Sequence, residues 1–149
     1  MSRLSLEAFA DRVTEVLPQL ARGMARRENN YLTKGVITPP QVWVLRQLTR
    51  QPECSMLELA DFMKMGLSSV TGMVDRLVRQ GLANRRRTEQ DRRMVFVDIT
   101  AKGRKILKEI LEQHRRTILD LFESLTAEER SIYLCILEKL VKKLSSNGK

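Results

Sequence analysis

The spacing of apolar residues predicts a mainly helical chain. Near the N-terminus, apolar residues recur every three or four positions, which places them on one face of a helix. They are Leu6, Phe9, Val13, Leu17, Leu20 and Met24. Pro18 interrupts this pattern, and proline removes a hydrogen bond and kinks a helix, so we expect one bent helix or two short ones. Residues 32–36 then read as a linker, in which Gly35 permits a turn.

A second helix is expected over residues 39–50. The side-chain oxygen of Thr38 can cap free amides, and Pro39 suits the first helical position, where its missing N–H is not needed. The apolar face of this helix consists of Val42, Leu45 and Leu48. A helix with one such face is expected to pack inward on a core.

A helix-turn-helix pattern follows, the arrangement that places a second helix in the major groove of DNA. Ser55 and Glu58 form a capping-box pattern that opens a short helix. A longer helix is expected over residues 67–80 and ends at Gly81. Its outer face begins with small polar residues and becomes basic. Generic helical hairpins share this pattern.

A strand hairpin is expected next, formed by residues 82–87 and 94–99 around a polar tip at residues 88–93. Apolar and more polar positions alternate over residues 94–99, as in a strand with one buried face. Seven arginines and no lysine lie between positions 76 and 93: Arg76, Arg79, Arg85, Arg86, Arg87, Arg92 and Arg93. The planar guanidinium suits phosphate and narrow minor grooves. Neighbouring side chains on a strand alternate in direction, so only one or two of Arg85, Arg86 and Arg87 are expected to contact phosphate.

Two further helices are expected at the C-terminal end. Thr100 would cap a long helix over residues 101–123, and Thr126 with Glu129 repeats the capping-box pattern before the last helix. Together with the first helix, these carry more apolar surface than the small module between them can cover. Burying that surface against a second copy of the chain is the simplest solution, so we expect a homodimer.

Composition narrows the function. The chain has 149 residues, with 27 Lys and Arg against 18 Asp and Glu, and its net charge of +9 should attract polyanions such as nucleic acid or an acidic membrane. No apolar run reaches the roughly 18 residues of a membrane span, and no signal peptide is evident, so we expect a cytoplasmic protein. Two distant cysteines and one histidine form neither a disulfide framework nor a metal site. No cofactor-binding pattern and no nucleophile near a base are present, so an enzyme is not expected.

The chain resembles the MarR family of bacterial winged helix-turn-helix regulators over nearly its whole length. The resemblance rests on "ITPPQVWVLRQL" (37–48), "LELADFMKMGLSSVTGMVDRLVRQGL" (57–82) and "RRRTEQDRRMVFVDITAKG" (85–103), together with the long terminal helices. It implies one domain spanning residues 1–149. Residues 1–36 and 101–149 would be dimerisation helices, and residues 37–100 a winged helix-turn-helix module with a small β-hairpin wing. Two such modules would bind a pseudo-palindromic DNA duplex.

The resemblance also assigns roles to single residues. Ser68, Ser69 and Thr71 would meet the major groove, and Arg93 at the wing tip would enter the minor groove. Arg76 would help to hold the DNA backbone, and Arg87 and Arg92 are further residues expected to bind DNA. Thr38 and Gln41 match positions aimed at phosphate, a role that exposed helix amides favour independently. Asp75 and Asp91 would orient arginines, because a carboxylate facing phosphate is repelled. The helix expected over residues 67–80 would be the reading helix, the one that contacts base edges. Many members have a capping serine where this chain has Gly66, so the residue at which this helix begins stays open.

The expected function is a ligand-responsive repressor, released from DNA by a small aromatic molecule; that release is implied by the resemblance alone. The alternative is a winged-helix module that binds another protein and contacts DNA incidentally. Two residues outside this scheme are open to interpretation. Cys54 precedes a helix N-terminus, which can activate a thiol, but it also suits inert packing. His114 lies on an apolar helical face and is expected in the core or an interface.

Overall fold

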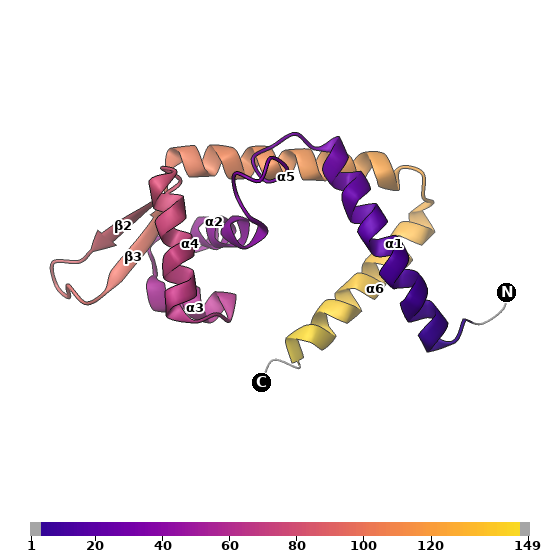
Figure 1. Ribbon diagram of the computed structural model, residues 1–149, viewed down its shortest axis with the longest axis horizontal. Helices are drawn as coiled ribbons and strands as arrows, with labels where there is room; N and C mark the ends of the chain where they lie inside the picture. Colours follow the sequence, from indigo (N-terminus) through magenta and orange to yellow (C-terminus); the bar gives the residue numbers. More distant parts are fainter. Residues whose placement is uncertain (1–3, 147–149) are drawn as a thin grey trace. The chain divides into compact units, whose positions relative to one another are not determined.

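The structure, a computed structural model, describes residues 4–146 (Figure 1). This part of the chain contains six helices and three short strands. They are α1 (Leu6–Arg27), α2 (Pro39–Arg50), β1 (Cys54–Ser55), α3 (Met56–Met63), α4 (Leu67–Arg79), β2 (Ala83–Arg87), β3 (Val95–Ile99), α5 (Ala101–Phe122) and α6 (Ala127–Ser146). The chain divides into two compact units, Met1–His114 and Arg115–Lys149.

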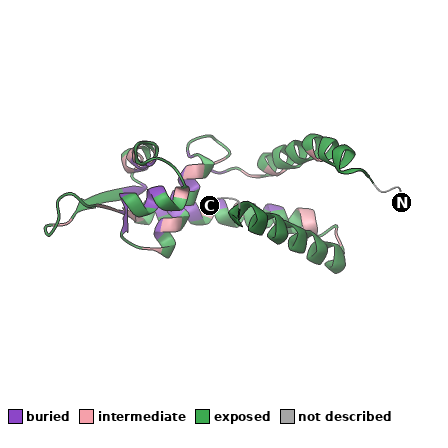
Figure 2. Cartoon of the chain, turned by 90° about the horizontal axis from the view of Figure 1, so that it is seen from below, coloured by how far each residue is buried: buried purple, intermediate pink, exposed green. Residues whose placement is uncertain are grey.

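The core of the first unit lies among α2, α3, α4, the sheet and the first half of α5, and Figure 2 colours the buried residues purple. The predicted inward face of α2 is confirmed, because Val42, Leu45 and Leu48 are all buried. From α4, Val70, Val74 and Leu77 are fully buried against them. Each such side chain contributes about 1.5–3 kcal/mol when removed from water. The helix-turn-helix is therefore a packed unit that can hold its outer face in one position.

The sheet confirms the predicted hairpin and adds a strand that the sequence did not indicate. Its order is β1-β3-β2, with both pairs antiparallel. Along the hairpin, Ala83 faces Ile99 and Arg87 faces Val95. The additional strand, β1, contains only two residues, and Cys54 faces Val97 in β3. Two residues are too few to show a strand pattern in the sequence.

The structure decides between the two expectations for the N-terminal segment, one bent helix or two short ones. It is one continuous helix of 22 residues with Pro18 inside, so the alternative of two short helices is wrong. Proline removes a single backbone hydrogen bond, and the helical residues on both sides keep theirs. The side chain of Ser5 caps the start of α1 by accepting a hydrogen bond from the amide of Ala8 (3.2 Å).

The connection between α1 and α2 is an ordered turn rather than a loose linker. Asn30 is fully buried, and its Oδ1 accepts hydrogen bonds from the amides of Leu32 and Thr33. Its Nδ2 donates to Glu28, whose carboxylate also contacts Nδ1 of His114 at 2.8 Å. The side chain of His114 is 51% exposed within this chain, so it lies outside the core of the unit.

The start of α5 packs closely against the start of β2. Thr100 donates a hydrogen bond from its hydroxyl to the carbonyl of Gly81 (2.7 Å) and accepts one from the amide of Gly103 (2.9 Å). Gly103 leaves no room for a side chain, since a Cβ there would lie 2.2 Å from the carbonyl oxygen of Leu82. Gly81 has a φ of +72°, a left-handed conformation that suits glycine.

The second unit contains the end of α5 and all of α6. The predicted capping box is confirmed, because the amide of Thr126 donates to Glu129 (2.8 Å) and the amide of Glu129 donates back to the Thr126 hydroxyl (3.2 Å). The rings of Phe122 and Tyr133 lie 5.1 Å apart. No residue described in α6 is buried within this chain, which leaves its apolar side chains exposed.

Candidate nucleic-acid interface

Helix α4 presents small polar groups on the face opposite the core. Ser68 and Ser69 are exposed at its start, and their hydroxyls form no hydrogen bond within residues 4–146. Thr71 is half-buried and donates its hydroxyl hydrogen to the carbonyl of Leu67 (2.7 Å), so only its oxygen lone pairs remain available. Gly66 precedes the helix and offers no side-chain cap. Two donor hydroxyls and one acceptor are therefore free to meet a ligand.

A groove of about 300 Å³ joins the start of α2 to the end of α4. Three predicted residues, Thr38, Gln41 and Arg76, line it together with Arg79. Arg79 was not among the predicted contacts. The signal was present in the sequence, because residues three apart on a helix lie on the same side. Two cations from α4 thus lie beside the exposed Thr38.

Gln41 is placed differently from the expectation of a phosphate contact. Its exposed fraction is only 3%, and its Oε1 accepts hydrogen bonds from the amide (2.8 Å) and the hydroxyl (3.1 Å) of Thr38. Pro39 and Pro40 occupy the first two helical positions and carry no N–H, so the start of α2 offers fewer free amides to an anion than a helix without proline. The charged residues that line this groove are Arg76 and Arg79, and both would attract an anion.

The seven arginines fall into two groups by their ion pairs. Arg85 is 2.6 Å from Asp75 and also donates to the carbonyl of Thr71 (3.3 Å). Arg86 contacts the carboxylates of Glu53 and Asp98. The others form no ion pair within the described residues: Arg76, Arg79, Arg87, Arg92 and Arg93. The cations left without a protein carboxylate are those on α4 and toward the tip of the wing.

The two aspartates expected to orient arginines act in different ways. Asp75 contacts the guanidinium of Arg85 directly. Asp91 instead accepts a hydrogen bond from the backbone amide of Arg93 (2.9 Å), and in the described residues it contacts no guanidinium. Its amide also donates to the hydroxyl of Thr88 (3.2 Å). Asp91 therefore shapes the turn that carries Arg93, because short polar side chains stabilise turns through nearby amides.

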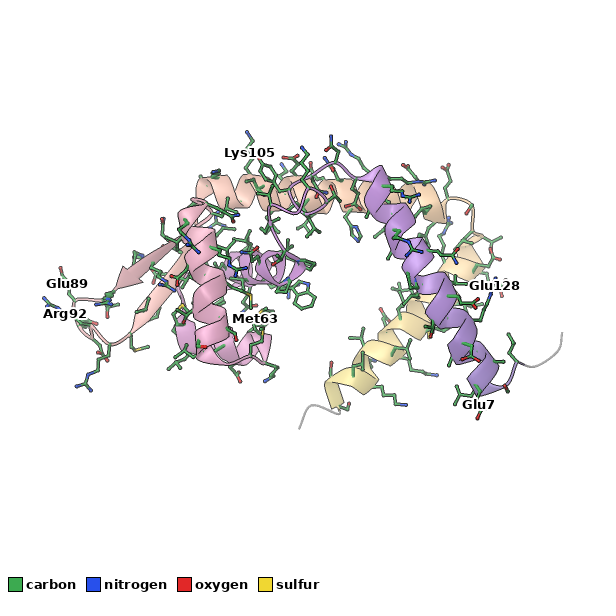
Figure 3. All side chains as sticks on the ribbon, in the orientation of Figure 1. Glu7, Met63, Glu89, Arg92, Lys105 and Glu128 are labelled. Carbon is green, nitrogen blue, oxygen red and sulfur yellow. The ribbon has the colours of Figure 1, made fainter. Side chains whose placement is uncertain are left out.

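The tip of the wing is exposed, whereas the base of the wing lies next to α4. Figure 3 shows Glu89 and Arg92 at the end of the hairpin, with side chains that project away from the sheet. A groove of about 310 Å³ at the wing base is lined by Thr71 from α4 and by Arg93. The two regions that were predicted to contact DNA are thus neighbours in the folded unit.

Other kinds of site find little support in the described part of the chain. Burial, with the nearby carboxylate of Glu58 as a smaller cause, raises the pKa of Cys54 to about 11. That shift favours the inert packing role over an activated thiol. Residues 4–146 hold no group of three or more His, Cys, Asp or Glu side chains suited to a metal ion. Nor does any helix among them have the length and apolar character to cross a bilayer.

Known proteins resemble this chain in both sequence and fold. The model of the MarR family matches residues 37–95. The HTH-type transcriptional regulator YsmB of Bacillus subtilis is 30% identical over 140 residues, covering 94% of this chain and 95% of that protein. The HTH-type transcriptional repressor MdtR of the same organism is 26% identical over 147 residues, covering 99% and 88%. A solved MarR family protein from Bacillus stearothermophilus aligns with a TM-score of 0.72 and 29% identity, covering 95% of this chain and 99% of that one.

Members of this family bind DNA, typically as dimers. The match to YsmB covers more of this chain than the family model does, because it extends beyond the winged module into the terminal helices. The chain belongs to the MarR family of winged helix-turn-helix transcriptional regulators, which are DNA-binding proteins and not enzymes.

Proposed function

We propose that the protein is a repressor that binds a pseudo-palindromic operator as a homodimer, with α4 in the major groove and the wing in the minor groove. The observation that carries this proposal is the distribution of ion pairs. Arg85 and Arg86 are held by protein carboxylates, whereas the arginines on α4 and toward the wing tip have none within residues 4–146. Cations without a protein partner are suited to phosphate oxygens.

Each group of residues has a defined role in this proposal. Ser68, Ser69 and Thr71 contact base edges, because hydroxyl groups can donate to or accept from several bases. Arg76 and Thr38 bind the DNA backbone, and the hydrogen bonds from Thr38 to Gln41 hold Thr38 in place. Arg79 adds a second cation to the same groove. From the wing, Arg93 and Arg92 enter the minor groove while Arg87 contacts phosphate.

The terminal helices support the dimer. Helix α1 has no buried residue within the described chain, and its apolar face includes Leu6, whose exposed fraction is 81%. In α6, Leu144 is 75% exposed and Ile132 is 54% exposed. Apolar faces of this length on a monomer indicate a protein interface. Residues 1–36 and 101–149 would pair with their copies, leaving residues 37–100 to bind DNA.

Repression and its release complete the proposal. One relative, MdtR, is named a repressor, and a dimer lying across promoter DNA would block transcription. A small aromatic effector that binds between the dimerisation helices and the winged module would change the spacing of the two α4 helices. The two half-sites lie about 34–36 Å apart, one helical turn of DNA. The effector need only bind more tightly to the dimer whose α4 helices no longer match this spacing. Each tenfold loss of affinity for DNA requires a difference of about 1.4 kcal/mol in effector binding between the two states.

The experiment is a titration of an operator found by footprinting the DNA that flanks the protein's own gene. If the dimer neutralises about eight phosphates, log affinity falls against log salt with a slope near −7. Replacing Arg93→Ala should weaken binding by about 1–3 kcal/mol. Lys105→Ala is the control, because Lys105 lies on α5 and its loss changes the net charge equally (Figure 3). This variant should bind almost as tightly as the original protein.

Two results would contradict the proposal. A flat salt response without saturable binding would favour the alternative of a module that binds another protein. Equal losses in Arg93→Ala and Lys105→Ala would mean that net charge matters and the wing tip does not.

A further inference from the structure

Three charged residues connect the parts of the wing on one face of the sheet. Arg86 in β2 contacts Glu53, which precedes β1, and its Nε lies 3.1 Å from Oδ2 of Asp98 in β3. Because the strand order is β1-β3-β2, these contacts span the full width of the sheet. We call Glu53, Arg86 and Asp98 the wing brace.

The strand register explains why these residues meet. Arg86 faces Phe96 and Asn84 faces Asp98, so Arg86 and Asp98 are diagonal neighbours on one face. Arg85 points to the opposite face, where it contacts Asp75 of α4. The wing is therefore tied on one face to α4 and on the other to the segment that enters α3.

The backbone at Glu53 indicates that its side chain has a role. Its φ of +63° lies in the left-handed region, where residues other than glycine are uncommon. Such a conformation is unfavourable for a residue with a side chain and persists only when the surrounding structure requires it. Glycine would relieve the strain but would remove the carboxylate that contacts Arg86.

The segment that carries Glu53 is itself fixed to the helix-turn-helix. Ser55 donates its amide to Glu58 (2.7 Å) and accepts a hydrogen bond from the Glu58 amide (3.1 Å). Gln51 adds a third bond to the same carboxylate (3.0 Å). Glu53 lies between Gln51 and Ser55 in the sequence, so it is held at both sides by the start of α3.

We propose that the wing brace is a positioning device, which holds the hairpin at the angle that brings Arg92 and Arg93 to the DNA while its own residues do not touch the DNA. This inference rests on the proposed function, in which the wing enters the minor groove. The hydrogen bond and charge of Glu53, with a smaller contribution from Asp98, raise the pKa of Arg86 above its usual value, so this guanidinium keeps its charge.

The substitution Glu53→Gln separates positioning from simple charge. It removes a negative charge from a DNA-binding protein, which by long-range attraction alone would tighten binding. The brace predicts the opposite sign: binding weakened by about tenfold, a coupling typical of residues in contact. Asp61→Asn is the matched control, because Asp61 is an exposed carboxylate of α3 that contacts only Lys64 (3.4 Å). This control should bind as tightly as the original protein or more so.

A double-mutant cycle supplies the readout that a merely structural role would not change. If Glu53 acts through the wing tip, Glu53→Gln should cost little once Arg93→Ala is present, so the two effects are not additive. On a shortened duplex that lacks the flanks contacted by the wing, Glu53→Gln should bind like the original protein. Glu53 is 62% exposed, so the melting temperature should hardly change.

Several outcomes would overturn the inference. Unchanged or tighter binding by Glu53→Gln would refute the brace, and so would a loss that adds fully to that of Arg93→Ala. If Arg93→Ala weakens binding and Glu53→Gln does not, only the brace is wrong. If Arg93→Ala itself has no effect, the wing contact of the proposed function is wrong, and the brace with it.

Discussion

The close contact at Gly103 makes a quantitative prediction about stability. A Cβ at this position would lie 2.2 Å from the carbonyl oxygen of Leu82 and 2.9 Å from Cγ1 of Ile99. Carbon atoms normally pack at about 3.5–4.0 Å, so the neighbours would have to move by an ångström or more. The nearest of them is backbone, and the amide of Thr100 also donates to that carbonyl (3.1 Å). We therefore expect Gly103→Ala to strain the joint between β2 and α5.

The size of the effect follows from overpacking in known cores, which costs about 1–3 kcal/mol. Gly103 should reach the upper end of this range, because a backbone carbonyl cannot rotate aside as a side chain can. A loss of about 3 kcal/mol would lower the melting temperature by about 6–12 °C for a protein of this size. The matched control is Gly72→Ala in α4, where a Cβ meets nothing within 4 Å. There the same change should stabilise the helix by about 0.5–1 kcal/mol.

Circular dichroism during thermal and urea unfolding would measure both variants. All proteins should be compared at one concentration, because the stability of a dimer depends on it. A melting temperature for Gly103→Ala within about 2 °C of the original would refute the reasoning, since it would mean that Leu82 moves aside at little cost. A similar loss in Gly72→Ala would show that the loss of glycine itself, and not the contact, is responsible.

Two further predictions concern ionisable groups near β1. In a Cys135→Ser variant, Cys54 is the remaining thiol, and its pKa of about 11 leaves about 0.1% thiolate at pH 8. Labelling by a disulfide reagent should therefore be slow in the folded protein and rapid in urea; rapid labelling without urea would contradict this. Hydrogen bonds from the amide of Ser55, then its hydroxyl and Gln51, lower the pKa of Glu58 below its ordinary value of 4.5. A carboxyl group whose pKa is lowered by folding stabilises the fold at pH values above its pKa in the unfolded chain. This stabilisation is lost as the pH falls through its pKa in the folded chain. Glu58→Gln should consequently be less stable than the original in urea at pH 7, and the two should converge in acid. A difference that does not depend on pH would mean that charge is irrelevant at this cap.

Local signals in the sequence were sufficient for the helices of the winged module. The positions of Val42, Leu45 and Leu48 defined the inward face of α2, and Gly81 marked the end of α4, which stops at Arg79 with Gln80 as its cap. These features depend on residues within a few positions of one another, because helical periodicity and capping are local. The hairpin was predicted for the same reason, and each of its strands starts one residue later than expected.

The sorting of the arginines could not be predicted, because it depends on residues distant in the sequence. Arg86 contacts Glu53, which lies 33 positions away and directly precedes β1, the strand that the sequence did not indicate. Alternation predicted that Arg85, Arg86 and Arg87 could not all face DNA, but it did not say which of them would be held by carboxylates. The role of Gln41 was also missed. Its type fits a phosphate contact, and only its burial shows that it supports Thr38.

The connection between α1 and α2, which contains the turn at the buried Asn30, is held by side chains on both sides of this turn. On one side, Gln113 of α5 forms two hydrogen bonds with the backbone of Asn29 (3.0 and 3.2 Å). On the other, Gln80 donates to the carbonyl of Val36 (2.8 Å), two residues before Thr38. We therefore expect a movement of α5 at Gln113 to displace the first residues of α2. Such a displacement would reach the groove that Thr38 and Gln41 line together with Arg76.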